Sequence, residues 1–285
     1  MKTRFLWPLV ALLFVVVCFG NVFARDELMI FCGAAYKKPM DEIIQMYMKK
    51  NNSDVRVIYG GVGTLLSQIT MSKRGDILMV PSSYIMEKAQ SKGLVVPDSR
   101  KDFAYVVPVI NVRKGNLKGI RSLADLAKPS VRVAIANPEI VFVGMLAAEI
   151  VEKSLTREDI KLFKKNIVTT PEDFNKLASA LLLDKVDAII GFHYLSSWYP
   201  DAIETIKLRP EEIQRIGAGQ IGILSHSKMM EQAKDFQRFL LSAEGQGVFA
   251  KYHYFGTPEE AARWVGDRKV VGGERPASTD WFGKE

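Results

Sequence analysis

The chain has few cysteines, few histidines and only one long apolar run. It contains two cysteines and three histidines in 285 residues. The histidines (His193, His226 and His253) and the scattered acidic residues show no metal-ligand spacing, so no metal centre is predicted. Beyond residue 24 no stretch is apolar enough to cross a membrane. Lysine and arginine are spread without a long basic block, so no nucleic-acid partner is predicted.

The single long apolar run lies at the N-terminus. Lys2 and Arg4 precede an apolar segment over residues 5–20, and Val22-Phe23-Ala24 ends it with small residues at the two sites that a signal peptidase reads. This pattern predicts a signal peptide over residues 1–24 that is cleaved after Ala24, and hence a periplasmic or otherwise extracytoplasmic protein. Its removal lowers the formal net charge of +7 by two. One cysteine leaves with it, so the remaining Cys32 has no partner for an internal disulfide.

The rest of the chain alternates short apolar runs with helical patterns, which predicts an α/β fold with mainly parallel sheets covered by helices. No repeat or low-complexity linker interrupts this alternation. Strands are predicted over residues 28–31, 55–59, 76–80, 104–112, 131–136, 167–169, 187–191, 203–208 and 221–224. Clear helical patterns cover residues 84–92, 122–127, 145–153, 171–183, 229–241, 244–251 and 258–264.

The first strand runs through a turn of small residues into a helix, in the segment MIFCGAAYKKPMDEI. A helix start presents free backbone N–H groups and the positive end of the helix dipole, which favour an anion. Ala35, Tyr36 and Lys37 are therefore candidate ligand-binding residues. Lys37 is the candidate charge partner, and a solvated lysine is the alternative.

Four later turns occupy similar positions at strand ends. A glycine-rich turn holds Gly61, Val62, Gly63 and Thr64, although it lacks the Lys-Ser/Thr ending of a nucleotide-binding loop. The other candidates have ordinary structural alternatives: a helix cap for Ser83, and a packed side chain for His193. Ligands of parallel α/β folds bind at the carboxyl ends of strands, and five such turns spread over the chain suit a cleft between two lobes. The remaining candidates are Asn137, Val141, Phe192 and Tyr194.

These segments together resemble the molybdate/tungstate-binding proteins of ATP-driven (ABC) uptake systems, which have the two-lobed type II periplasmic-binding fold. The matching pieces are CGAAYKKPMDEI, GGVGTLLSQI, GDILMVPSSYIMEKAQSKGLV, VRVAIANPEIVFVGMLAAEIV, DKVDAIIGF and SAEGQGVFAKYHYFG. The resemblance implies a discontinuous first lobe over residues 25–106 and 210–285 and a second lobe over 107–209. It also implies crossover strands near residues 105–109 and 206–222.

In that family, serine hydroxyls and backbone N–H groups hold the oxyanion without counter-charges. Here Ala35 and Val62 stand where the family has serines, and Phe192 stands where it has a tyrosine. Hydrogen bonds to a charged group contribute about 1.5–3 kcal/mol each, so these departures predict a changed ligand preference.

The resemblance implies a monomeric binding protein that closes over a small anion, delivers it to a membrane permease and needs no cofactor. Two alternatives stay open: a binding protein for another anion or a small organic acid, acting in transport or in sensing, and an enzyme. The enzyme would use Cys32 as a thiol nucleophile with His193 as its base.

Overall fold

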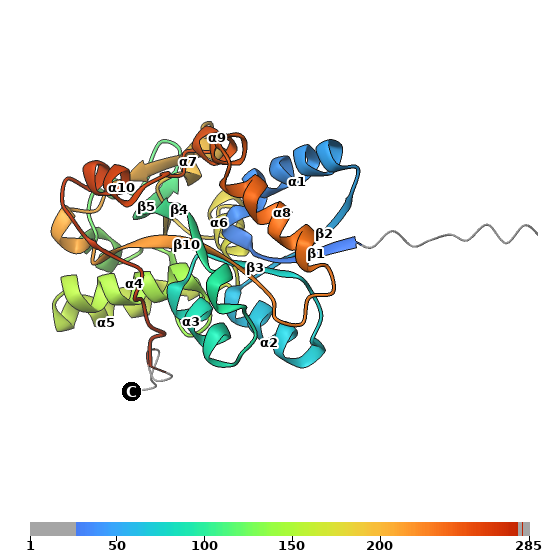
Figure 1. Cartoon of the computed structure of the whole chain (residues 1–285). Coiled ribbons are helices and arrows are strands. Elements are labelled where there is room, and N and C mark those ends of the chain that lie inside the picture. Colours follow the sequence, from blue (N-terminus) through green and yellow to red (C-terminus); the bar gives the residue numbers. More distant parts are fainter. Residues whose placement is uncertain (1–26, 279–280, 282–285) are drawn as a thin grey trace, which may run out of the picture.

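Residues 27–278 and 281 are described by a computed structural model, in which helices surround two separate β-sheets (Figure 1). The first lobe is the part built around the six-stranded sheet, and the second lobe is the part built around the five-stranded sheet. No helix of this described part is both long and apolar enough to cross a membrane. The predicted signal peptide lies outside the described residues.

The first sheet has the strand order β11-β10-β3-β1-β2, and β4 also pairs with β10. The strand β1 is parallel to β2 and β3, so the turns that follow these three strands meet at one edge of the sheet. The strands are β1 (Glu27–Gly33), β2 (Asp54–Gly60), β3 (Ile77–Val80), β4 (Lys101–Val106), β10 (Arg215–Ile223) and β11 (Val270–Val271).

The second sheet has the order β7-β6-β8-β5-β9. Both sheets are mixed: they hold the predicted parallel βα units, and the strands that enter or leave each lobe add antiparallel pairs. The strands are β5 (Pro108–Arg113), β6 (Val133–Ala134), β7 (Ile167–Thr169), β8 (Ala188–Phe192) and β9 (Ile203–Ile206).

The helices of the first lobe lie on both sides of its sheet, with α1 on one side and α2 and α3 on the other (Figure 1). A 3-10 turn (Ala34–Tyr36) leads into α1. The helices are α1 (Lys37–Asn51), α2 (Val62–Ser72), α3 (Ser83–Ser91), α4 (Phe142–Ser154), α5 (Arg157–Asn166), α6 (Phe174–Leu182), α7 (Leu195–Trp198), α8 (Met230–Leu241), α9 (Ala243–Lys251) and α10 (Pro258–Val265).

The apolar run over residues 104–112 is two strands in different sheets, not one kinked strand. The strand β4 ends at Val106 and β5 begins at Pro108, so Val107 carries the chain from the first lobe to the second. Proline lacks a backbone N–H and interrupts the hydrogen-bond ladder, which lets the chain change sheet there. The chain returns between β9 and β10.

Helix α5 was not predicted. Its sequence carries an N-cap signal, because the Thr156 hydroxyl accepts a hydrogen bond from the Asp159 N–H at 3.1 Å. Phe163 is its one fully buried residue and most of its other residues are charged, so few apolar residues mark the helix in the sequence.

The largest apolar cluster extends from the first lobe across the boundary into the second. It includes Ala35 and Val62 from the first lobe and Val141, Phe174 and Phe192 from the second. The lobes therefore pack against each other through buried side chains in this state.

Helix α4 approaches the end of β6 closely because residue 144 is glycine. A Cβ atom on Gly144 would lie 2.2 Å from the carbonyl oxygen of Ala136. The next nearest atoms, the carbonyl carbons of Ala136 and Asn137, are also backbone atoms, which cannot move aside as a flexible side chain would. The glycine thus sets where the first turn of α4 sits.

We predict that Gly144→Ala lowers the free energy of unfolding by about 1–3 kcal/mol, as expected for overpacking against backbone. The matched control is Gly247→Ala in α9, where a new Cβ meets no atom within 4 Å. That change should stabilise the protein by up to about 1 kcal/mol, because alanine favours helix over glycine. Urea denaturation of the three proteins measures both effects, and equal stability of Gly144→Ala and the unmodified protein would contradict this packing.

Candidate functional site

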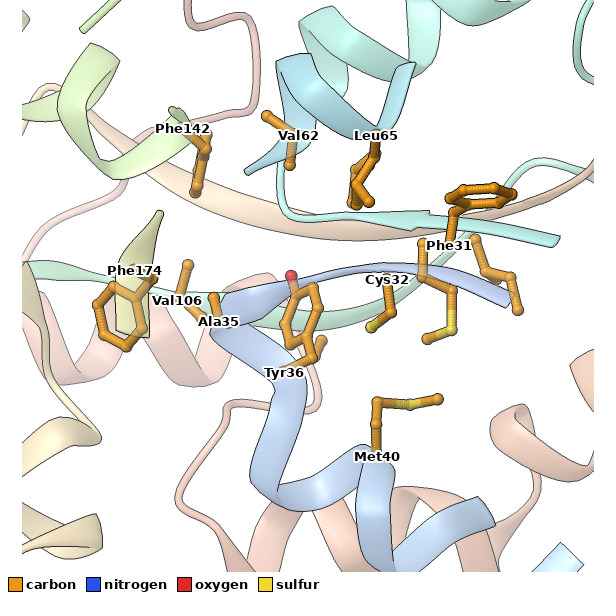
Figure 2. Close-up of a cluster of buried hydrophobic side chains, with 14 of the residues drawn as sticks. Phe31, Cys32, Ala35, Tyr36, Met40, Val62, Leu65, Val106, Phe142 and Phe174 are labelled. Atoms are coloured by element: carbon orange, nitrogen blue, oxygen red, sulfur yellow. The ribbon is translucent and has the colours of Figure 1, made fainter. Parts of the chain in front are cut away.

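A small cavity of about 20 Å³ lies between the two lobes. This volume is close to that of one water-sized group. Strands β1, β2, β3 and β8 all end beside it. Figure 2 shows Ala35, Val62, Phe142 and Phe174 approaching from separate segments. The lining residues are Gly33, Ala34, Ala35, Gly60, Gly61, Val62, Pro81, Val141, Phe142, Val143, Phe174 and Phe192.

The lining contains no charged side chain and no side-chain hydroxyl or amide. Polar groups at this cavity therefore belong to the backbone. The phenyl rings of Phe142, Phe174 and Phe192 form one wall, with the Phe192 ring centroid 5.8 Å from that of Phe142 and 5.3 Å from that of Phe174.

Three helical segments begin at this cavity without a side-chain cap. They are the 3-10 turn at Ala34 that leads into α1, helix α2 at Val62 and helix α4 at Phe142. By contrast, a serine, threonine or aspartate side chain caps α3, α5, α6, α9 and α10. The first N–H groups of a helix have no partner within it, so the cavity is where three sets of backbone donors gather without a side-chain acceptor.

Five of the predicted site residues line this cavity. They are Ala35, Gly61, Val62, Val141 and Phe192. The other eight lie behind it, at its rim or on the surface: Tyr36, Lys37, Gly63, Thr64, Ser83, Asn137, His193 and Tyr194.

Lys37 points away from the cavity. It is exposed, and its ammonium pairs with the Asp41 carboxylate at 2.6 Å. Tyr36 is fully buried behind the lining and packs on Phe103, with ring centroids 4.9 Å apart. The structure thus gives no charge partner to an anion at this site.

Asn137 shapes the turn that leads into α4. Its side-chain oxygen accepts from the Glu139 N–H at 2.9 Å, and its carbonyl accepts from the Val141 N–H at 2.9 Å. The residue therefore positions Val141 rather than lining the cavity itself.

Gly63 and Thr64 line a wider hollow of about 570 Å³ beside the cavity. The Gly63 N–H donates to the Ile140 carbonyl across the lobe boundary at 3.2 Å. Nearby, a Cβ on Gly61 would lie 2.3 Å from the Glu172 carbonyl oxygen, so this turn fits the second lobe only as glycine. These contacts describe a closed arrangement of the lobes.

Ser83 is engaged by the C-terminal segment. Its hydroxyl donates to the Glu274 carboxylate at 3.2 Å and accepts from the Gly273 N–H at 2.7 Å. The hydroxyl hydrogen of Ser83 is therefore already donated to Glu274 and cannot be donated to a ligand in this arrangement.

His193 lies at the crossover between the lobes. Its Nδ1 accepts from the Val107 N–H at 3.2 Å, and its Nε2 donates to the His253 carbonyl at 2.8 Å. Its ring also stacks on Phe255 with centroids 4.3 Å apart. His193 is therefore a packed side chain, which was the structural alternative to ligand binding.

Tyr194 and Tyr254 both donate their hydroxyls to the Ala35 carbonyl, and the bond from Tyr194 ties the second lobe to the 3-10 turn before α1. The link lies at the back of the cavity, because Ala35 lines it. Tyr194 thus supports a cavity residue from behind.

Cys32 and His193 do not form a nucleophile and base. Cys32 is completely buried, and burial raises the pKa of its thiol well above its ordinary value. Both ring nitrogens of His193 already have backbone partners. Among residues 27–278 and 281, no group of three histidine, cysteine, aspartate or glutamate residues is placed to hold a metal ion.

The sequence reasoning missed Phe142 and Phe174 as lining residues. Phe174 begins α6 after the turn Pro171-Glu172-Asp173, a sixth strand-to-helix turn at the same edge. Phe142 directly follows Val141, which was predicted. Treating every such turn as a candidate would have found Phe174.

The chain matches the family model described as bacterial extracellular solute-binding protein over residues 28–255. It therefore belongs to this family of bacterial extracellular solute-binding proteins. Its two lobes form the type II periplasmic-binding fold, as the sequence resemblance predicted.

Similar proteins extend over nearly the same length. A Haemophilus influenzae protein whose name describes it as a binding protein is 28% identical over 244 residues, covering 85% of this chain and 95% of its own. The molybdate-binding protein ModA of Mycobacterium tuberculosis H37Rv is 22% identical and covers 80% of this chain and 84% of its own. Among solved structures, the sulfate-binding protein SubI of Mycobacterium tuberculosis superposes with a TM-score of 0.73 at 14% identity, over 86% of this chain and 93% of its own.

We predict that His193 makes stability fall on acidification. Burial is the main cause that lowers its pKa from the ordinary 6.5 to about 4. Between pH 6.5 and about 4 the unfolded chain binds a proton that the folded chain does not. The free energy of unfolding should therefore fall as pH falls through this range, with a slope approaching about 1.4 kcal/mol per pH unit from this group.

The measurement is urea denaturation at several pH values for the unmodified protein and His193→Gln. Glutamine should lower stability at pH 7 and flatten the slope between pH 6.5 and 4. Both proteins should share one slope between pH 7 and 8.5, which serves as the control range. Parallel curves below pH 6.5 would contradict the assignment.

Proposed function

We propose that this protein binds a small oxyanion between its lobes and delivers it to the membrane permease of an ABC uptake system. The observation that carries the proposal is the meeting of three uncapped helix starts at one apolar cavity. The membership in the extracellular solute-binding family supports the transport role. Molybdate and tungstate are the first ligands to test, because a molybdate-binding protein is among the relatives.

The helix starts favour an anion by two effects that act together. Their N–H groups can donate hydrogen bonds to the anion, that of Gly63 once separation of the lobes releases it from the Ile140 carbonyl, and their dipoles place partial positive charge at the same point. The apolar walls exclude water, which strengthens both effects. An anion held in this way needs no lysine or arginine, which agrees with the position of Lys37 outside the cavity.

Binding requires the lobes to separate, because about 20 Å³ leaves no room for a polyatomic anion in the closed arrangement. We propose a hinge at the two crossovers, at Val107 and between β9 and β10. The first lobe would then comprise residues 25–106 and 210–285, and the second lobe residues 107–209. Closure over the ligand would bury both it and the apolar rim.

The N-terminal signal pattern supports an extracytoplasmic protein, and the chain would act there as a monomer. Sensing through a membrane receptor is the alternative use of the same binding event. Catalysis is a weaker proposal, because Cys32 and His193 are separately engaged.

A small organic acid is a second candidate ligand, and the phenyl wall favours it. An oxyanion with oxygens on every side would place one of them against the rings of Phe142, Phe174 and Phe192, where no donor is available. A carboxylate with a short alkyl group would place its charge on the helix starts and its apolar part against the rings.

The first test is thermal and chemical unfolding of residues 25–285 with single anions at equal ionic strength. Molybdate, tungstate, sulfate, phosphate and short-chain carboxylates form the panel, with chloride as the control. A ligand at about 100 times its Kd should raise the free energy of unfolding by about 2.7 kcal/mol. Stabilisation by an oxyanion supports the first ligand class, by carboxylates alone the second, and no response from any anion contradicts both.

Val62→Ser should strengthen oxyanion binding. The new hydroxyl would stand at a cavity-lining helix start and donate to the anion, which is worth about 1.5–3 kcal/mol or about a tenfold to hundredfold lower Kd. Val62→Ala is the matched control, because it removes similar bulk without adding a donor. Calorimetric titration of both variants measures the difference, and equal Kd values would contradict an oxyanion at this position.

A further inference from the structure

The C-terminal segment does not end at the last helix but returns along the boundary between the lobes. After α10 it forms β11 beside β10, and the Gly272 N–H donates to the Ile216 carbonyl at 2.9 Å. In Figure 1 this dark red segment passes from α10 between α4 and α3. Gly272 and Gly273 have φ values of +65° and +74°, which allow the chain to fold tightly against α3.

Glu274 fixes this segment to the first lobe. The residue is fully buried, and its carboxylate lies at the start of α3. It accepts hydrogen bonds from the Ser82 hydroxyl at 2.6 Å, the Ser83 hydroxyl at 3.2 Å and the Tyr84 N–H at 3.0 Å. This carboxylate places a negative charge and hydrogen-bond acceptors at the start of α3. The chain itself therefore supplies the anion that a helix start favours.

The residues after Glu274 attach to the second lobe. The Ala277 N–H donates to the Pro138 carbonyl at 3.1 Å, in the turn that leads into α4. Trp281 is buried in the second apolar cluster among residues that include Val131 and Phe163. The Lys164 ammonium lies 4.6 Å from the centre of the Trp281 ring.

These attachments lie beside the cavity, not at a distant surface. Pro276 lines the hollow of about 570 Å³ together with Gly63 and Thr64 from the first lobe and Ile140 from the second. Tyr84 lies in the first turn of helix α3 and Pro138 in the turn that leads into α4, and they hold the segment on its two sides. Separation of the lobes at this edge must break one of the two attachments.

We propose that residues 272–278, together with Trp281, form an interlobe strap that holds the ligand-free protein near its closed arrangement, with Glu274 as its anchor on the first lobe. Glu274 is a positioning residue, because it acts on the ligand site through the relative placement of the lobes. This proposal depends on the proposed hinge motion but not on the identity of the ligand. Its test therefore uses the protein without ligand.

The experiment measures the distance between spin labels at Gln68→Cys on α2 and Glu152→Cys on α4, both exposed positions on different lobes. Cys32 is completely buried and should not react with the label. The full chain of residues 25–285 should give one short distance. A chain that ends at residue 271 should shift most of its distribution to longer distances.

Glu274→Gln is the second variant and keeps the whole chain. It removes the charge and one acceptor from the start of α3, so it should add a longer-distance population. Asp267→Asn is the matched control, because it makes the same chemical change on the same segment outside the strap, where Asp267 pairs with the nearby Lys269 at 2.7 Å. Its distribution should equal that of the unmodified protein.

A distribution that stays short in the chain ending at residue 271 would overturn the proposal. Circular dichroism and thermal melting establish whether that chain is folded. If that chain is unfolded, the Glu274→Gln variant becomes the deciding test. A distance distribution of Glu274→Gln that equals that of Asp267→Asn then overturns the proposal. Failure of the anion panel with a positive distance shift would reject the proposed ligands and leave the strap supported.

Discussion

Backbone N–H groups at the start of a helix need acceptors, and this fold brings three helix starts to the same apolar cavity. At five other helix starts of the described chain a serine, threonine or aspartate side chain caps the helix, whereas α7 and α8 also begin without such a cap. At the cavity the corresponding residues are glycine and valine, which have no acceptor to offer. Buried donors need acceptors, and no side chain of the cavity lining supplies one, so the arrangement favours an acceptor that fits between the lobes.

This constraint explains why the surroundings of the cavity are apolar and tightly packed. Hydrogen bonds and helix dipoles act more strongly where water is excluded. Gly61 allows the first lobe to approach the Glu172 carbonyl, and Gly144 allows α4 to begin against Ala136. The glycines thus bring backbone donors close together, whereas larger residues would hold the lobes or the helix apart.

Two further contacts connect the cavity to the motion of the lobes. His193 holds the crossover at Val107 through hydrogen bonds at both ring nitrogens, and Glu274 holds the C-terminal segment on α3. One lies at the proposed hinge and the other at the cleft edge. If the lobes move as proposed, a ligand that binds the closed form would gain from contacts that favour closure, because less free energy would be needed to reach the binding-competent state.

The sequence alone determined most of the strands and helices in their order, the two-lobed fold and five cavity-lining residues. Hydrophobic periodicity and glycine-rich turns are local features, so they can be recognised without tertiary structure. Helix α5 was missed because its buried face is small, and the run 104–112 looked continuous because both strands it contains are buried.

Only the tertiary structure decided which candidates face the cavity. Lys37 and Tyr36 follow Ala35 directly, yet one points to solvent and the other into the core, because successive helical residues face different directions. Ser83 and His193 have the chemistry of ligand-binding residues, but distant partners, Glu274 and Val107, already engage them. Pairings across such sequence separations depend on how the lobes and the C-terminal segment pack, and no local pattern contains that information.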